Sequence, residues 1–97
     1  MFQSMAEVIA ANEKAGYYFF ESGTKRFFDS RIGRTLYGGR YFITSEQFHG
    51  SDGRSAPRAY TIREVGPDGD IDTVGDFNKW PTAAAARREI KKLLAGS

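Results

Sequence analysis

The sequence predicts a small α+β domain with an N-terminal helix, an antiparallel β-meander of three or four strands, and a C-terminal helix packed on one face of the sheet. Three observations support this fold class. Residues 60–77 form two strand-like runs around a tight turn, residues 82–95 carry apolar side chains at helical spacing, and residues 4–7 resemble a helix start.

Size and composition indicate one globular domain over residues 1–97, since single cores commonly serve about 100 to 150 residues. Apolar residues make up 40% of the chain and charged residues 27%, which excludes a disordered or fibrous protein. The chain has no cysteine, so thiol chemistry and disulfides are ruled out. No apolar run approaches the roughly 20 residues that a membrane helix needs, and we expect a cytosolic protein without membrane contact.

The first helix is expected to begin at Ser4, because Ser4 and Glu7 have the spacing of a capping box. In that motif each side chain accepts a hydrogen bond from the other residue's backbone N–H. Gly16 is expected to end the helix in the left-handed conformation. The aromatic segment that follows, up to Phe27 and Phe28, predicts irregular structure or one short helix.

A hairpin is expected around Gly38 and Gly39, because consecutive glycines readily adopt the positive φ angles of tight turns. Its second strand should run over residues 40–48. The side chains that alternate along this strand leave open which of its two sides faces the core. Residues 49–57 are rich in glycine, serine and proline and predict an exposed loop.

The next hairpin has the strongest local signal, since residues 66–69 combine glycine, proline and aspartate in the order that a tight turn favours. In the returning strand, Ile71 and Phe77 share one face, whereas Asp72 and Asp76 share the other with Val74. The carboxylates predict that their face meets water, so we expect a sheet covered only on the Ile71 side.

The last helix is expected to begin after Thr82, a favourable N-cap, and to end near Gly96. Ala86 and Ile90 belong to its core-facing stripe, which also contains Ala83, Leu93 and Leu94. Its outer side carries four basic residues, namely Arg87, Arg88, Lys91 and Lys92.

Catalytic and metal-binding patterns are weak. His49, Ser51 and Asp52 supply the side chains of a hydrolytic triad, but such residues normally converge from separate elements rather than from one short loop. The alternating aspartates of the second hairpin resemble the start of a calcium loop, yet Thr73 and Lys79 stand where that motif requires glycine and glutamate. We therefore expect no enzyme activity, no metal and no cofactor.

Charge is unevenly placed although the net charge is only +2. Blocks of like charge along a chain either steer a charged partner or form solvated faces of opposite sign. Basic residues with aromatic neighbours suit nucleic acid and protein interfaces equally. The predicted partner-binding residues are Arg31, Arg34, Tyr37 and Arg40 on one side and Asp68, Asp70 and Asp72 on another, and the alternative nucleic-acid set is Arg87, Arg88, Lys91 and Lys92.

Most of the chain resembles small orphan proteins encoded by bacteriophages and integrative mobile elements. The resemblance lies in the run from Arg40 to Phe48, in residues 59–65 and 68–75, and in the final Ala/Arg-rich helix. It implies a genetic setting in which small non-enzymatic proteins include anti-CRISPR inhibitors of host defence.

Residues 40–95 also resemble the arm-type DNA-binding domain of phage integrases, which has three antiparallel strands followed by a helix. With the N-terminal helix added, the order of elements is similar to a double-stranded RNA-binding domain. These resemblances imply a nucleic-acid-binding accessory domain as the alternative function.

The preferred hypothesis is a non-enzymatic inhibitor that docks on a host defence protein or ribonucleoprotein complex. Nucleic acid is the alternative partner, and a small structural or self-associating protein is a third class. The oligomeric state is left open.

Overall fold

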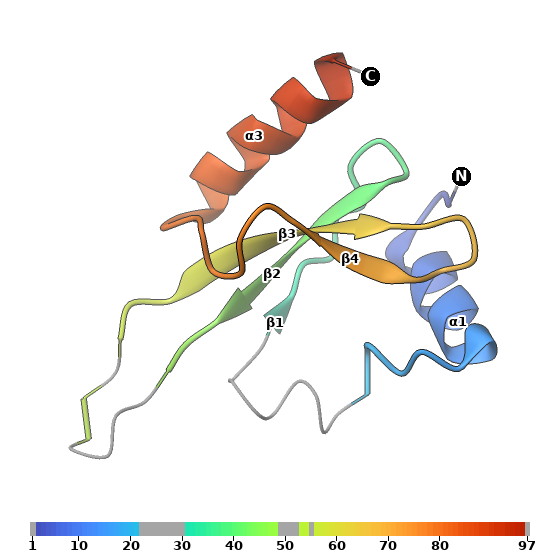
Figure 1. Cartoon of the computed structure of the whole chain (residues 1–97), viewed down its shortest axis with the longest axis horizontal. Helices are drawn as coiled ribbons and strands as arrows, with labels where there is room; N and C mark the ends of the chain where they lie inside the picture. Colours follow the sequence, from blue (N-terminus) through green and yellow to red (C-terminus); the bar gives the residue numbers. More distant parts are fainter. Residues whose placement is uncertain (1, 22–30, 49–52, 55, 97) are drawn as a thin grey trace.

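The computed structural model describes residues 2–21, 31–48, 53–54 and 56–96. It confirms the predicted α+β class, with a helix at each end and four antiparallel strands in one sheet (Figure 1). Each strand pairs with its neighbour in sequence, as in a meander. The elements are α1 (Met5–Ala15), β1 (Arg31–Ile32), β2 (Tyr41–Glu46), β3 (Ala59–Val65), β4 (Ile71–Val74) and α3 (Ala83–Ala95).

Helix α1 has the predicted ends. The hydroxyl of Ser4 accepts a hydrogen bond from the Glu7 N–H at 3.3 Å, and Gly16 adopts a φ of 84°. The carboxylate of Glu7 accepts from the N–H of Gln3 at 2.7 Å, one residue earlier than a capping box requires. Phe27 and Phe28 lie outside the described residues.

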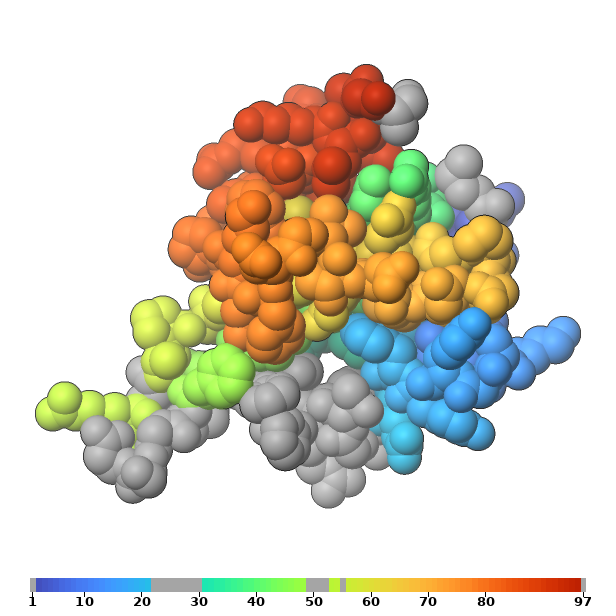
Figure 2. All heavy atoms as spheres, in the orientation of Figure 1, coloured from blue at the N-terminus to red at the C-terminus, as the bar shows by residue number. Residues whose placement is uncertain are grey.

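The sheet carries an apolar cluster on each face. On one face, Phe42 and Val65 pack against Met5 and Val8 of α1. On the other face, Ile43, Ile62 and Val74 pack against Ala86 and Ile90 of α3. Figures 1 and 2 show α3 and α1 on different sides of the molecule, with strand β4 between them in the view.

The expectation of a sheet covered only on the Ile71 side is therefore wrong. Helix α3 packs on the opposite face, which Val74 shares with Asp72. Asp72 stays exposed because β4 is an edge strand, so a residue on this face can still meet water. Phe77 follows β4 and is 46% exposed, not buried as a core residue would be.

Strand β2 resolves the ambiguity that alternation left open, because all six of its residues are buried. The turn before β2 confirms the positive φ angles predicted for the two glycines, which are 59° at Gly38 and 68° at Gly39. The other arm of this hairpin is a single bridge between Tyr37 and Tyr41. The strand that pairs with the end of β2 is instead β1, which was not predicted from the sequence.

A buried polar side chain fastens α1 to the turn between β3 and β4. The Asn12 amide is fully buried, donates to the Gly69 carbonyl at 2.8 Å and accepts from the Phe19 N–H at 2.9 Å. A Cβ on Gly69 would lie 2.8 Å from the backbone of Ala11 and Asn12, and its φ is 89°. Glycine is required there for both conformation and space.

Helix α3 begins as predicted, since the Thr82 hydroxyl accepts a hydrogen bond from the Ala85 N–H at 3.1 Å. Its inner stripe is buried, with Ala86 and Ile90 exposed by 0% and 1%. None of the helices in the described ranges is long and apolar enough to cross a membrane.

We predict that Ile90→Ala lowers the free energy of unfolding by roughly 2–5 kcal/mol, because it leaves a cavity between α3 and the sheet. Urea denaturation measures this loss. Lys91→Ala, at an exposed neighbouring position, is the control and should change stability by no more than about 0.5 kcal/mol. A loss below that value for Ile90→Ala would contradict the packing of α3.

Candidate functional site

Three arginines from separate segments line one recess between β1 and the start of α3. Arg31 lies on β1, Arg34 follows that strand, and Arg87 lies on α3. The recess has a volume of 260 Å³, and Tyr37 and Tyr60 also line it. We call this feature the arginine recess and define it by these five residues.

The positive charge of the arginine recess is not neutralised by the surrounding fold. Arg31, Arg34 and Arg87 are exposed, and their side chains form no hydrogen bond or ion pair within the described part of the chain. No carboxylate stands among the described residues that line the recess. Like charges held close together repel, and a bound anion would relieve that repulsion.

Other described arginines have partners. Arg40 pairs with Glu64, Arg63 pairs with Glu46, and Arg58 donates to the Ser45 hydroxyl at 3.0 Å. Arg54 also has an interaction partner. Of the arginines without one in the described ranges, Arg88 lies outside the recess and the other three line it. Three of the four unpaired guanidinium groups in the described ranges thus line one recess.

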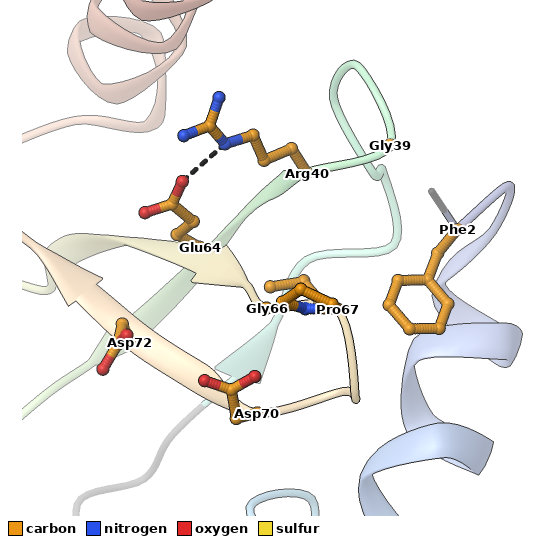
Figure 3. A pocket seen from close by; sticks show the side chains of 9 residues that line it. Phe2, Gly39, Arg40, Glu64, Gly66, Pro67, Asp70 and Asp72 are labelled. Atoms are coloured by element: carbon orange, nitrogen blue, oxygen red, sulfur yellow. Dashed lines mark hydrogen bonds and ion pairs between the residues drawn. The ribbon is translucent and has the colours of Figure 1, made fainter.

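A second pocket, of 620 Å³, lies at the turn between β3 and β4 and carries acidic groups (Figure 3). Asp70 and Asp72 line it, and Phe2 supplies an aromatic ring from the segment before α1. Figure 3 shows Arg40 bonded to Glu64 at another side of this pocket. We call it the acidic pocket.

Side chains at the acidic turn have shifted pKa values. The Tyr17 hydroxyl donates to Asp68 at 2.8 Å, and this bond to a carboxylate raises the pKa of Tyr17. A hydrogen bond shared between Asp68 and Asp70 lowers the pKa of Asp68 and raises that of Asp70. Within the described ranges, no three potential ligand side chains are grouped so that they could hold a metal ion.

The structure regroups the predicted binding residues. Arg31, Arg34 and Tyr37 lie together as expected, but Arg40 lines the acidic pocket with Asp70 and Asp72. Arg40 directly precedes β2, and its side chain pairs with Glu64 although its backbone N–H donates to the Tyr37 carbonyl at 3.0 Å. Its place among the partner-binding residues stays a prediction.

The alternative nucleic-acid set is divided as well. Arg87 lines the arginine recess, whereas Arg88, Lys91 and Lys92 are exposed elsewhere on α3. The loop residues His49, Ser51 and Asp52 lie outside the described residues.

Sequence reasoning missed a buried ion pair on the α1 face of the sheet. The Arg63 guanidinium lies 3.6 Å from the Glu46 carboxylate and donates to the Thr44 hydroxyl at 3.0 Å. It also lies over the rings of Phe19 and Phe77, at 5.4 and 5.6 Å. Charged residues on a sheet are usually exposed, so the sequence carries no signal for this pair.

Glu46 is only 2% exposed, and its Oε2 has no hydrogen-bond partner among the residues that the structure describes. Burial raises the pKa of Glu46, while the nearby charge of Arg63 acts in the opposite direction. Shifted pKa values often mark functional groups. Here the guanidinium is enclosed by the protein's own hydroxyls and rings, and we interpret the pair as structural.

The sequence pattern of a family of unknown function (DUF7447) matches residues 4–91. The chain belongs to this family. The matched span includes α1, all four strands, the arginine recess and most of α3. No curated protein and no solved structure matches the chain. Family membership names no activity, so the resemblances to phage and integrase proteins stay predictions.

We predict that Arg63→Met costs roughly 3–5 kcal/mol at neutral pH, because it leaves the Glu46 carboxylate buried without its cation. The double variant Glu46→Gln/Arg63→Met should lose less, since the buried charge is gone. Urea denaturation of both proteins measures the difference. Equal losses would show that charge is not the cause.

The same series predicts a pH dependence. Because the folded pKa of Glu46 is raised, its stabilising contribution is present below the ordinary value of 4.5 and is lost as the pH rises through the folded value. The stability of Glu46→Gln relative to the unmodified protein should therefore increase over that interval. A constant difference would contradict the raised pKa.

Proposed function

We propose that the protein is a non-enzymatic nucleic-acid-binding protein that holds phosphate groups in the arginine recess. The observation that carries this proposal is the gathering of Arg31, Arg34 and Arg87, without ion-pair partners in the described ranges, around one recess. Guanidinium groups present paired donors that match phosphate oxygens.

The surroundings of the recess suit the same ligand. Lys91 lies one helical turn beyond Arg87, so the two form a basic row along α3, and both are exposed. Tyr37 and Tyr60 add aromatic rings at the recess, and nucleic-acid bases commonly stack on such rings.

The acidic pocket does not oppose this mode of binding, because it lies at the other end of the strands. Arg31 is paired with Ser45, next to Tyr60 at the start of β3. Asp70 and Asp72 instead lie at the start of β4, beside the end of β3. A strand of nucleic acid at the recess would therefore meet the positive end of the sheet.

Binding is expected to weaken steeply with salt. Four phosphate contacts, from the three recess arginines and Lys91, predict a fall of roughly a hundredfold for duplex DNA between about 50 and about 200 mM salt. Fluorescence anisotropy with a labelled duplex and a labelled single strand measures it. Arg31→Gln and Arg87→Gln should weaken binding, whereas Lys14→Gln, the same charge change on α1, should leave it unchanged.

Absence of binding at the lowest salt would remove the nucleic-acid proposal. Equal losses from Arg31→Gln and Lys14→Gln would mean that only net charge matters and that the recess is not the site.

A second candidate function is an anti-CRISPR-like inhibitor that docks on a host defence protein or ribonucleoprotein complex. The observation that favours it is the acidic turn, where Asp68, Asp70 and Asp72 stand apart from the arginine recess. Defence nucleases have basic surfaces for nucleic acid, and a row of carboxylates could occupy such a surface in place of phosphates.

This candidate predicts that expression of the protein restores phage plaquing on a host with an active CRISPR system. The double change Asp70→Lys/Asp72→Lys should abolish the effect if the carboxylates imitate phosphate, while Arg31→Glu/Arg34→Glu should abolish it if the arginines anchor the complex. Failure of the unmodified protein against several CRISPR types would leave the nucleic-acid proposal as the better supported one.

A further inference from the structure

The arginine recess has more positive charge than an internal phosphate of a nucleic acid needs. Three guanidinium groups surround it, whereas a phosphodiester carries a single negative charge. A terminal phosphate carries about −1.5 to −2 at neutral pH and offers three acceptor oxygens. We infer that the recess binds the terminal phosphate of a nucleic-acid strand, an inference that rests on the proposed nucleic-acid function.

The size of the recess favours one small group. Its 260 Å³ lie below the roughly 300–1,000 Å³ that are typical of pockets for larger ligands. The three arginines line this one small recess, so they can act together on a single ligand group. A single group that meets three cations is matched best by the higher charge of a strand end.

The start of α3 adds further donors. Ala83, the first residue of the helix, lines the recess. The Thr82 hydroxyl accepts a hydrogen bond from the Ala85 N–H. The backbone N–H groups of Ala83 and Ala84 have no hydrogen-bond partner within the described residues. Free amides and the helix dipole favour an anion at this position, and the arginines supply the specific contacts.

A nucleic acid fits this site better than a phosphorylated peptide. Beyond Arg87, α3 continues with the exposed residues Arg88, Lys91 and Lys92, and Glu89 is the single acid among them. These cations could contact the phosphates that follow a strand end, whereas a peptide beyond its phosphorylated residue has no regular negative charge for them.

The test compares three single-stranded oligonucleotides of one sequence, with a 5′-phosphate, with a 3′-phosphate or with hydroxyls at both ends, each labelled away from the end under study. Fluorescence anisotropy should show at least ~tenfold tighter binding of one phosphorylated form, as expected for several charge-assisted hydrogen bonds to one group. Inorganic phosphate should compete more strongly with that form than with the hydroxyl form.

Matched variants locate the effect. Arg31→Gln and Arg34→Gln should remove the preference for the phosphorylated end, while Arg88→Gln, on the same helix but outside the recess, should weaken all three forms and keep the preference.

Equal affinity for the three oligonucleotides, with steep salt dependence, would overturn the terminal-phosphate inference and leave the proposed function standing. No binding of any form would overturn both. Tighter binding of a phosphoserine peptide than of every oligonucleotide would overturn the assignment to nucleic acid.

Discussion

The structure depends on a charged pair that is enclosed between the strands and the aromatic side chains. Arg63 on β3 contacts Glu46 and Thr44 on β2 and Thr73 on β4. One side chain therefore connects β2, β3 and β4. This arrangement fixes the register of the sheet. A slip of one residue would turn both charges toward the α3 face, among apolar side chains such as Ile62, where burying them without partners would be costly.

With the register fixed, each face of the sheet receives its helix. Asn12 fastens α1 to the turn at Gly69, and the Ala86–Ile90 stripe fastens α3 to the other face. The placement of α3 bears on the proposed function, because it brings Arg87 to the same recess as Arg31 of the first strand. The arginine recess is therefore a product of tertiary packing and exists only when α3 is docked.

The parts of this fold that follow from local chemistry were predictable from the sequence. Ser4 and Thr82 cap their helices through hydrogen bonds to residues three positions away, and the turn that ends in Gly69 is closed by a backbone hydrogen bond to Gly66. The covered second face was not predictable, because exposed Asp72 and partly buried Val74 share it on the same strand and differ only in their position along that strand. Neither was the grouping of Arg31 with Arg87, which depends on how α3 crosses the sheet.

The arginines that the fold leaves unpaired are informative because the same fold pairs other arginines with carboxylates. Arg40 is matched by Glu64, and Arg63 is matched by Glu46 at the cost of burying a carboxylate with a raised pKa. A carboxylate beside Arg31 or Arg87 would have been simpler to accommodate, since both positions are exposed. Their mutual repulsion opposes folding, so its persistence calls for a gain elsewhere. The anionic ligand that we propose for the recess would supply that gain, because it replaces repulsion between cations with attraction to a shared partner.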